Sequence, residues 1–230
     1  MIVALILAAG RGERFGDDRV PKQFCDIGGK PLLVHSVEKY AAMPEIDAVV
    51  VTANPLFLKE TRAALAGDGL TDRVEIVIGG DTRQASISNA VAAAWPDNAP
   101  DAGDLVVIHN AASPNTECDF VRTCIDAMQD CDGVQACVPD TRTVFEKSGD
   151  KIGRVLPRSQ LVYNCDPLIY RGDVFHDVTT TQRERGAAGE TTTDTALELG
   201  YRIRLIESGY DNIKVTNRWD LEAVRAAMTR

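Results

Sequence analysis

The sequence predicts an α/β fold with a mostly parallel central sheet. Short apolar runs of strand length alternate along the chain with segments whose apolar residues recur at helical spacing. The first apolar run also passes directly into a glycine-rich loop. Because parallel neighbours need crossover connections, helices are expected on both faces of the sheet. Ligands bind beyond the carboxyl ends of the strands in such sheets, so the loops that follow the strands are the candidate site.

The composition fits one folded domain over residues 1–230. Hydrophobic residues make up 44% of the chain, which is enough for a sizeable core. The net charge of −9 argues against nonspecific binding of nucleic acid. The apolar run at residues 2–9 is too short to span a bilayer and has no basic leading segment. Neither a membrane anchor nor a signal peptide is expected, and a cytoplasmic location is predicted.

The six cysteines are expected to be structural. They form no C-x-x-C pair, and their spacings match no zinc module. In a chain with no predicted secretory signal, reduced and mostly buried thiols are expected in place of disulfides or a metal site.

The loop after the first strand has the composition of a phosphate-binding loop. Gly10, Gly12 and Gly16 are spaced through it, and glycine lets backbone N–H groups turn towards an anion without interference from a Cβ atom. Such donors next to a helix start offer partial positive charge to phosphate oxygens. Four cations add full charges to this loop: Arg11, Arg14, Arg19 and Lys22.

Spacing excludes two common glycine loops. A dinucleotide-binding loop needs G-x-G-x-x-G, but here the glycines follow G-x-G-x-x-x-G. It also needs an acidic residue about twenty positions on at a strand end, whereas Asp26 comes early and precedes two glycines. The P-loop pattern G-x-x-x-x-G-K-[ST] does not occur. The pattern L-A-A-G-x-G-x-R-F-G followed by P-K is instead similar to the signature of sugar-nucleotidyltransferase-type enzymes, which bind a nucleoside triphosphate.

Apolar periodicity predicts the other elements of the α/β body. Pro31 suits the first turn of a helix, and Asn54 with Pro55 ends a strand. Loops at Gly10, Gly79 and His109 follow strands and are expected to line one cleft. Strands are predicted at residues 47–52, 74–78, 104–109 and 134–138, and helices at 32–40, 56–65 and 119–129, with a further helix ending near residue 95.

Residues 139–170 are predicted to form a β-arm inserted in this body. Segments 141–145, 151–155 and 161–163 alternate polar with apolar residues, and residues 148–150 offer a Ser-Gly-Asp turn. A hairpin this polar is seldom stable alone, so the arm is expected to pack on a partner subunit in a homodimer.

The residues after the arm return to α/β character. The sequence predicts helices over 171–180, 195–200 and 219–228, a mobile segment over 182–189, a helix cap within 190–194 and a strand over 203–207.

Six further motifs follow the glycine loop in a fixed order. They are G-G-D-T-R-Q-A-S-I at 79–87, H-N-A-A-S-P at 109–114, V-P-D-T at 138–141, Arg158, Thr193 with Asp194, and D-N-I-K-V-T at 211–216. Together with the loop they resemble the 2-C-methyl-D-erythritol 4-phosphate cytidylyltransferase family, including its relatives that make CDP-ribitol. The resemblance runs nearly from end to end. It implies a Rossmann-like nucleotidyltransferase fold with a β-arm for dimerisation.

The resemblance also implies a reaction. In the family a substrate phosphate oxygen attacks the α-phosphate of CTP, pyrophosphate leaves, and Mg²⁺ is the cofactor. No covalent enzyme intermediate is needed, so the protein's task is alignment and charge neutralisation. The implied partners are CTP and a small phosphorylated acceptor.

Residue roles follow by position. Arg14 and Lys22 match residues that hold the triphosphate and stabilise charge at the α-phosphorus, and Lys214 matches a lysine that reaches the reacting phosphates. The implied CTP-binding residues are Ala8, Ala9, Gly10 and Gly12 in the phosphate loop and Gly79, Gly80 and Ser86 at the cytosine edge. The implied acceptor-binding residues are Asn110, Ser113, Thr193 and Arg158, the last arriving on the arm of the neighbouring subunit. Asn110 and Asp211 are the candidate metal ligands.

Each role has a simpler structural alternative. The alternatives are solvated loop cations for Arg14 and Lys22, helix caps for Ser86 and Thr193, a surface lysine for Lys214 and an ion pair within the arm for Arg158. His109 ends a strand and is expected to orient its loop rather than to transfer a proton.

The acceptor side departs from the family pattern. Where the family typically has H-D-A-x-R-P, this chain has Asn110 in place of the carboxylate and Ser113 in place of the arginine. An amide oxygen can touch a metal but brings no charge to neutralise Mg²⁺, and serine cannot replace a bidentate anion donor. The family's tryptophan and glutamine are also absent from residues 161–167.

Three functions therefore stay open. The chain could be a cytidylyltransferase that uses methylerythritol phosphate, or a relative that charges ribitol phosphate or another phosphate or phosphonate acceptor for a cell-surface polymer or secondary pathway. The third is a catalytically weak nucleotide-binding protein. The presence of Arg14, Lys22, Lys214 and Arg158 argues against the third.

Overall fold

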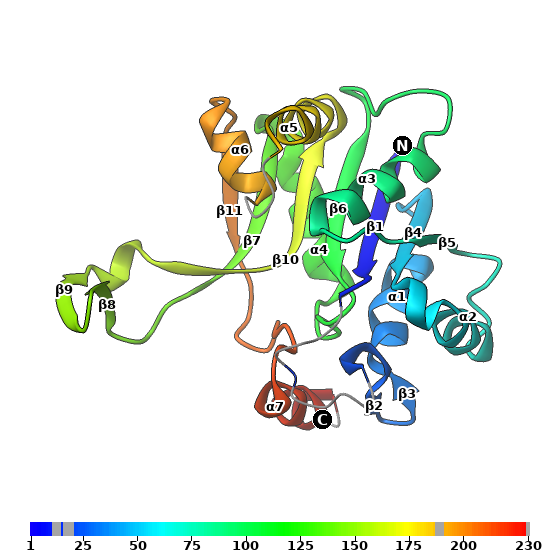
Figure 1. Ribbon diagram of the computed structural model, residues 1–230, viewed down its shortest axis with the longest axis horizontal. Coiled ribbons are helices and arrows are strands. Elements are labelled where there is room, and N and C mark those ends of the chain that lie inside the picture. Colours follow the sequence, from blue (N-terminus) through cyan, green and yellow to red (C-terminus); the bar gives the residue numbers. More distant parts are fainter. Residues whose placement is uncertain (11–14, 16–20, 187–190, 229–230) are drawn as a thin grey trace.

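The computed structural model describes residues 1–10, 15, 21–186 and 191–228. These residues form a seven-stranded sheet with helices on both faces and a hairpin that projects from one side (Figure 1). The strand order is β11-β7-β10-β6-β1-β4-β5. All neighbours are parallel except β10, which is antiparallel to both β6 and β7. The predicted α/β class with a mostly parallel sheet is confirmed.

The elements agree with most of the predicted segments. The central strands are β1 (Ile2–Ala8), β4 (Ala48–Ala53), β5 (Glu75–Ile78), β6 (Leu105–Asn110), β7 (Gly133–Pro139), β10 (Val162–Arg171) and β11 (Ile203–Glu207). The α-helices are α1 (Leu32–Ala42), α2 (Leu58–Gly67), α3 (Arg83–Ala94), α4 (Cys118–Asp126), α5 (Gly172–Arg185), α6 (Thr192–Glu198) and α7 (Arg218–Met228). Two small ladders join β2 (Asp26–Ile27) to β3 (Lys30–Pro31) and β8 (Val144–Ser148) to β9 (Lys151–Leu156).

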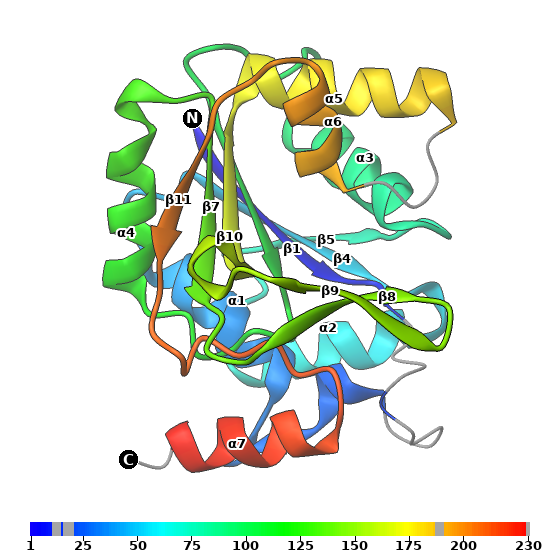
Figure 2. The same ribbon diagram turned by 90° about the vertical axis from the view of Figure 1, so that its left-hand side faces the viewer.

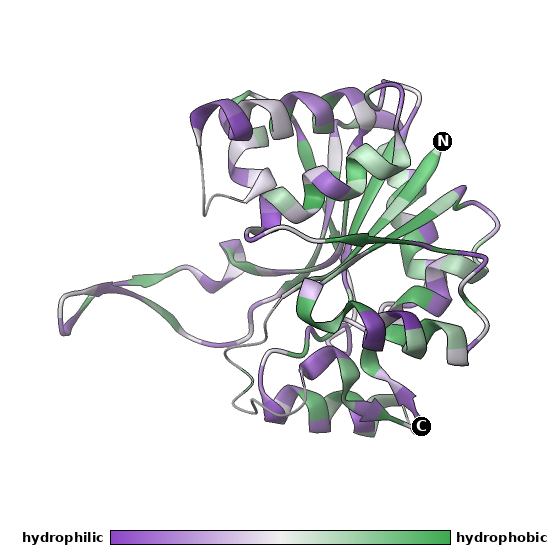
Figure 3. Cartoon of the chain, turned by 45° about the vertical axis from the view of Figure 1, so that its right-hand side comes forward, coloured by the Kyte–Doolittle hydropathy of each residue, from purple (hydrophilic) through white to green (hydrophobic). Residues whose placement is uncertain are grey.

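Both faces of the sheet are buried. Ala4 and Ile6 of β1 belong to a core packed with α1, α2 and α4, whereas Val3 and Leu5 belong to a second core packed with α3, α5 and α6. Figure 2 shows α4 on one side of the sheet and α3, α5 and α6 on the other. Because both faces need apolar side chains, β1 is a continuous apolar run rather than an alternating one. In Figure 3 the strands of the central sheet are mostly hydrophobic, whereas the helices also carry many hydrophilic residues.

A third, smaller core joins the two ends of the chain. Val215, Leu221 and Val224 pack in it with Phe15 and Ile27. The segment before α7 and the start of α7 are thereby held against the region that follows β1. Residues far apart in sequence thus meet at one end of the sheet.

The arm is shorter than the sequence predicts. The projecting hairpin consists of β8 and β9, but Val162–Arg171 is β10, which lies between β6 and β7 in the central sheet. Leu168 and Tyr170 are buried there. Placing residues up to 170 in the arm was therefore wrong. The alternating residues at 161–163 belong mainly to the outer end of a core strand.

The predicted mobile segment is partly helical. α5 continues to Arg185, and the buried amide of Gln182 donates to the Thr191 carbonyl and to Thr195 Oγ1, both at 3.0 Å. These bonds fix the end of α5 against α6. The helix cap expected within 190–194 is Thr191, which forms a capping box with Asp194. Residues 187–189 of the predicted segment lie outside the described part of the chain.

Two compositional predictions can be compared with the structure. All six cysteines are free thiols, and three of them are buried rather than most. Within the described ranges, none of the helices has the length and apolar character needed to cross a membrane.

Candidate active site

A cleft of about 920 Å³ opens at the carboxyl ends of β1, β4 and β6. Because these strands are parallel neighbours, their ends meet at one edge of the sheet. The predicted site residues that line the cleft are Ala8, Ala9, Gly10, Lys22, Gly80, Ser86, Asn110 and Lys214. The loops after β1, β5 and β6 all contribute to this lining, so the prediction that the loops at Gly10, Gly79 and His109 line one cleft is confirmed.

Backbone contacts fix the start of the phosphate loop. The Asn54 side-chain amide donates to the Ala9 carbonyl at 2.9 Å, and the Ala8 N–H donates to Thr52 Oγ1 at 3.3 Å. Both partners come from the end of β4 and its loop. Gly10 follows at the exposed rim, where a Cβ atom would meet nothing within 4 Å. Gly12 and Arg14 lie outside the described residues.

Gly79 and Gly80 are required by close packing. A Cβ atom on Gly79 would lie 2.3 Å from the Ala9 Cβ and 3.0 Å from Ser86 Oγ, and one on Gly80 would lie 2.4 Å from the Ala85 Cβ. Such separations are far below van der Waals contact, so only glycine lets this turn approach the phosphate loop. The turn after β5 is therefore pressed against the end of β1.

Ser86 shapes this turn from inside α3. Its hydroxyl accepts a hydrogen bond from the Gly80 N–H at 3.1 Å and lies 3.0 Å from the Thr82 carbonyl, to which it can donate. The N-cap of α3 is Thr82, whose side chain accepts from the Ala85 N–H at 3.0 Å. The alternative that Ser86 caps the helix is therefore wrong. Ser86 instead holds the Gly80 backbone at the wall of the cleft.

Asn110 is the centre of a polar network at the end of β6. Its Oδ1 accepts hydrogen bonds from Lys214 Nζ at 3.0 Å and from Arg83 Nη1 at 3.1 Å. Its Nδ2 donates to both carboxylate oxygens of Asp166, at 2.8 and 3.0 Å. Two cations on the cleft wall thus share one amide oxygen, and a buried carboxylate holds the opposite side of the amide.

Ser113 lies behind the cleft rather than in its wall. It is 1% exposed, and its hydroxyl donates to Asp166 Oδ2 at 2.5 Å. Asp166 is itself 5% exposed, and its backbone carbonyl accepts from Asn212 Nδ2 at 2.6 Å. The two positions that depart from the family pattern, Asn110 and Ser113, therefore converge on one carboxylate.

The motifs did not single out Arg83 or Asp166. Arg83 lies within the G-G-D-T-R-Q motif and lines the cleft, so its charge next to a predicted loop was an available signal. Asp166 had no such signal, because it belongs to the segment that the sequence assigned to the arm.

Lys22 reaches the cleft from a 3-10 helix over Lys22–Phe24. Its Nζ donates to the carbonyl of Val215 at 2.9 Å. Lys22 and Lys214 therefore approach the cleft on segments that are hydrogen-bonded to each other. The half-buried position of Lys22 and its long-range bond do not fit a solvated loop cation.

Besides Gly79 and Ser113, three predicted residues do not line this cleft. Arg158 is exposed on the arm side, donates to the Thr141 carbonyl at 3.2 Å and makes no ion pair within the described part of the chain. Thr193 lies in the first turn of α6 with its hydroxyl 3.4 Å from the Tyr170 hydroxyl, and the cap of that helix is Thr191. Asp211 is exposed. The structure thus excludes the arm ion pair for Arg158 and the cap role for Thr193.

His109 supports the loop after β6. Because the Ser113 carbonyl can only accept, His109 Nε2 must donate to it at 3.0 Å, and Nδ1 then accepts from the Tyr40 hydroxyl at 3.0 Å. Burial lowers the pKa of His109, although the Asp166 carboxylate opposes the shift. Burial likewise raises the pKa of Tyr40, and Asp166 adds to that rise. The neutral ring orients the loop, as predicted.

The predicted metal ligands are not brought together. Asn110 Oδ1 already faces two cationic side chains, and Asp211 does not line the cleft. Over the described residues, no group of three or more His, Cys, Asp and Glu side chains is arranged to hold a metal ion.

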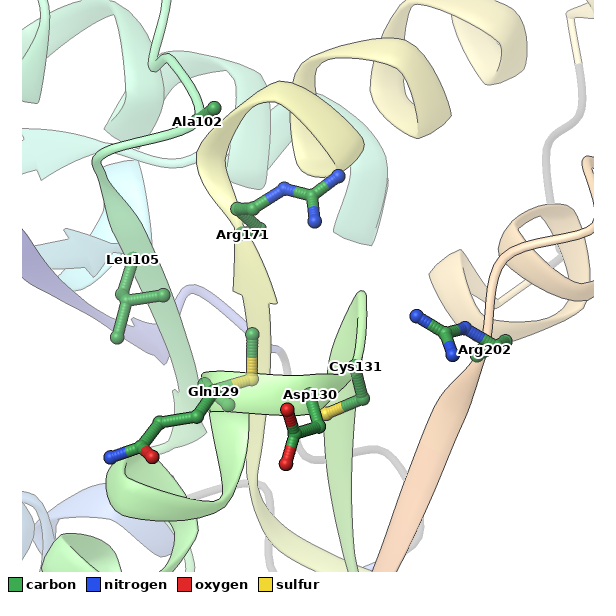
Figure 4. A pocket seen from close by; sticks show the side chains of 8 residues that line it. Ala102, Leu105, Gln129, Asp130, Cys131, Arg171 and Arg202 are labelled. Carbon is green, nitrogen blue, oxygen red and sulfur yellow. The ribbon is translucent and has the colours of Figure 1, made fainter.

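A second pocket lies at the opposite end of the sheet, near the start of β6 (Figure 4). Arg171 and Arg202 line it. Arg171 is paired with Asp132 at 3.3 Å and with Asp173 at 2.6 Å, and these carboxylates raise its pKa. The main positive charge at this pocket is therefore already neutralised within the chain.

The fold and the first cleft together define a class of protein. These features are a sheet covered by helices on both faces, a glycine-rich loop after the first strand, and lysines at the edge where the parallel strands end. They are the features of a nucleotidyltransferase. The family model described as IspD, 2-C-methyl-D-erythritol 4-phosphate cytidylyltransferase, matches residues 2–230. The chain belongs to this family.

Curated relatives fall into two sizes. A bifunctional enzyme IspD/IspF from Granulibacter bethesdensis is 34% identical over 230 residues, which cover 99% of this chain and 56% of the relative. A 2-C-methyl-D-erythritol 4-phosphate cytidylyltransferase from Acidobacterium capsulatum is 27% identical over 96% of this chain and 94% of the relative. This chain therefore spans about half of the bifunctional relative and nearly all of the other.

Solved structures share the fold. The 4-diphosphocytidyl-2C-methyl-D-erythritol synthase of Anaerococcus prevotii superposes with a TM-score of 0.80 at 20% identity, covering 100% of this chain and 98% of that one. The 2-C-methyl-D-erythritol 4-phosphate cytidylyltransferase of Thermus thermophilus gives 0.77 at 24% identity, with complete coverage of both chains. The mostly parallel sheet and the projecting β8–β9 hairpin are both part of the fold that these structures share.

Proposed function

We propose that this chain, acting as a single nucleotidyltransferase domain with a projecting arm, transfers CMP from CTP to a phosphorylated polyol and releases pyrophosphate. Methylerythritol 4-phosphate is the proposed acceptor, because the chain belongs to the family of that name. The observation that carries the proposal is the convergence of Lys22, Lys214 and Arg83 on one cleft beside the glycine-rich end of β1. Three cations at such an edge suit a triphosphate.

The proposed reaction is an in-line displacement at the α-phosphorus. An acceptor phosphate oxygen forms the new P–O bond while the bond to the bridging oxygen breaks, and its electron pair leaves with pyrophosphate. The attacking phosphate is already anionic, so no general base is required. Lys22 and Lys214 lie where they can offset the negative charge that gathers in the transition state.

The cytosine is proposed to sit against the Gly79–Gly80 turn. Backbone groups of that turn can read the base edge only if the turn keeps its shape, which the Ser86 hydroxyl supports by bonding to Gly80. Ser86 is 5% exposed, so it acts more through the backbone than by direct contact with the base.

The chain's residues do not fit the two metal ligands expected from the sequence. Asn110 Oδ1 already accepts hydrogen bonds from Arg83 and Lys214, and Asp211 does not line the cleft. Mg²⁺ is commonly held by substrate phosphates and water with few protein ligands. We therefore keep Mg²⁺ as the proposed cofactor on the family resemblance and assign it no ligand in this chain.

A homodimer through the arm is the proposed assembly. Phe145, Ile152 and Val155 are 50, 62 and 61% exposed on the hairpin, and such a surface favours a partner. Arg158 follows β9 and is absent from the lining of its own chain's cleft. Both observations support a role for Arg158 at the acceptor phosphate of the neighbouring subunit.

A different acceptor is the second candidate. Asn110 and Ser113 carry no charge, and both are engaged by Asp166, so the acceptor pocket lacks the charged pair of the family pattern. Ribitol phosphate or another phosphate or phosphonate would then be the substrate.

A panel assay tests both candidates. The protein is incubated with CTP, Mg²⁺ and the phosphates of methylerythritol, ribitol, glycerol and common sugars, and pyrophosphate release is followed. Turnover with methylerythritol phosphate supports the first candidate, and turnover with another acceptor only supports the second. Tight CTP binding with no turnover of any acceptor would contradict the enzyme proposal and favour a binding protein. Replacing CTP by ATP, GTP or UTP provides the matched control for base recognition.

A further inference from the structure

Asp166 does not line the cleft itself, but it lies directly behind Asn110, which does. It comes from β10, the strand inserted antiparallel between β6 and β7. Its carboxylate accepts from Asn110 Nδ2 through both oxygens and from the Ser113 hydroxyl through one of them. At 5% exposure it is almost completely shielded from water.

The two Asp166 oxygens fix which way the neighbouring Asn110 carboxamide points. A carboxylate only accepts hydrogen bonds, so the side of Asn110 that faces it must be the NH₂ group. The amide oxygen is then turned towards Lys214 Nζ and Arg83 Nη1, which can only donate. The two contacts to Asp166 and the contacts to Lys214 and Arg83 all require the same orientation of the Asn110 amide.

Asp166 also touches the segment that carries Lys214. Its backbone carbonyl accepts from Asn212 Nδ2 at 2.6 Å, and Asn212 Oδ1 accepts from Thr116 at 2.9 Å. Asn212 is 6% exposed and lies two residues before Lys214. Asp166 therefore fixes both the Asn110 amide, which accepts from Lys214, and the segment that carries Lys214.

We propose that Asp166 is a positioning residue of the active site, which orients the Asn110 carboxamide so that its oxygen holds Lys214 and Arg83 at the reacting phosphates. This inference rests on the proposed function. The family pattern has a carboxylate at position 110. In this chain Asp166 of β10 supplies a carboxylate instead, and the Asn110 side chain lies between it and the cleft.

The inference makes a specific prediction about exchanging the two residues. Asn110→Asp alone sets two carboxylates against each other at hydrogen-bond distance, where like charges repel. Adding Asp166→Asn removes that conflict. The new aspartate can accept from Lys214, Arg83 and the asparagine amide, and the asparagine oxygen can accept from Ser113. Every pair of residues bonded in the wild type is thereby bonded again, with one of the two hydrogen bonds between positions 110 and 166 lost and the charge on the other residue.

The test compares the wild type with N110D, D166N and the double variant N110D/D166N. We expect N110D to lower kcat at least ~100-fold and D166N about 10-fold, because small displacements of catalytic groups are costly. In the N110D background, D166N should instead raise kcat at least ~10-fold. A simple charge effect gives another result, since removing an anion beside two cations would favour CTP and its transition state. N110D as active as the wild type, D166N without effect, or a double variant no better than N110D would overturn the assignment.

Asp104→Asn is the matched control. Asp104 is also buried, at 9% exposure, and accepts from the Trp95 indole and from the Asp101 N–H, but it lies at the other end of β6. This variant should lower the unfolding temperature while leaving kcat within about twofold of the wild type. A comparable loss of kcat in D104N would show that any buried aspartate is needed, which overturns a specific positioning role.

A second readout needs no turnover. The side-chain amide signals of Asn110 can be identified in a ¹H–¹⁵N spectrum by their loss in N110D. They should shift in D166N and stay in place in D104N. Unchanged signals in D166N would contradict the inference even if the wild type proved inactive. Conversely, an inactive wild type with shifted signals would count against the proposed function alone.

Discussion

Lys22 Nζ donates a hydrogen bond to the backbone carbonyl of Val215 at 2.9 Å, although 193 residues separate the two. The bond joins the segment after the phosphate loop to the segment that carries Lys214. Both lysines line the cleft, so their separation depends on this contact. Positive charge from the two ends of the chain is thereby brought to one place.

Replacing Lys22 with Ala should lower kcat at least ~100-fold, because a preorganised cation near the phosphorus would be lost together with the Val215 contact. Steady-state rates with CTP and the acceptor identified in the panel assay measure the effect. Lys39→Ala is the control, since Lys39 forms a surface ion pair with Glu117 and does not line the cleft. An unchanged kcat in K22A would move the proposed charge stabilisation to other residues.

Replacing Gly79 with Ala should weaken CTP binding about tenfold or more. The added Cβ would lie 2.3 Å from the Ala9 Cβ, so the turn and the phosphate loop must separate. Overpacking of this kind also costs about 1–3 kcal/mol of stability. Calorimetric titration with CTP and urea unfolding give the two values.

Gly67→Ala is the matched control for that experiment. Gly67 ends α2, and a Cβ atom there would meet nothing within 4 Å. We expect unchanged CTP affinity and unchanged or slightly higher stability, because alanine restricts the unfolded chain. If G79A bound CTP as tightly as G67A, the turn would not be a wall of the nucleotide site.

The two halves of the site differed in how well the sequence predicted them. The nucleotide half was predictable because Gly10 and Gly79 each follow a strand, and parallel strands end at one edge. The role of Asp166 was not predictable, because it depends on β10 entering the sheet antiparallel between β6 and β7. An alternating pattern of polar and apolar residues is the same for a free hairpin and for the exposed end of a core strand. Only the pairing of β10 with distant strands separates the two.

Similar reasons explain the smaller differences. Ser86 and Thr193 are of the type that caps helices, but in both motifs a nearby threonine has the cap position. Gln182 looked like part of a polar linker, and its burial follows from hydrogen bonds to α6 that no local pattern encodes. Local sequence predicts the presence of a helix better than its boundaries.

Stability should fall as the pH is lowered through the range in which unfolded histidine titrates. Burial lowers the pKa of His109 in the folded state, so at neutral pH the ring is neutral in both states and the effect is absent. Below about pH 6.5 the unfolded chain binds a proton that folded His109 does not, so the free energy of unfolding decreases. The decrease ends below the lowered pKa of the folded state. Urea unfolding between pH 8 and pH 5 measures it.

His109→Gln should flatten this dependence, whereas His176→Gln should not. His176 is exposed on α5 and has no part in the loop after β6. The glutamine amide can still donate towards the Ser113 carbonyl, which limits the loss of structure. Equal pH slopes for the wild type and H109Q would show that the imidazole is not the group responsible.

If Arg158 completes the acceptor site of the neighbouring subunit, two inactive variants should restore activity when mixed. K22A damages the cleft of its own chain, and R158A would damage the cleft of its partner. In a mixed dimer both defects therefore fall in one site and leave the other intact. With random pairing, about a quarter of the wild-type activity should return, because half of the dimers are mixed and each has one intact site. Co-refolding the two variants and measuring pyrophosphate release tests this.

K22A mixed with Lys214→Ala is the control: both lysines line the cleft of their own chain, so no mixed dimer has an intact site and no activity should return. Recovery in the control, no recovery in the test mixture, or elution of the active enzyme as a monomer in gel filtration would contradict an acceptor site shared across the arm.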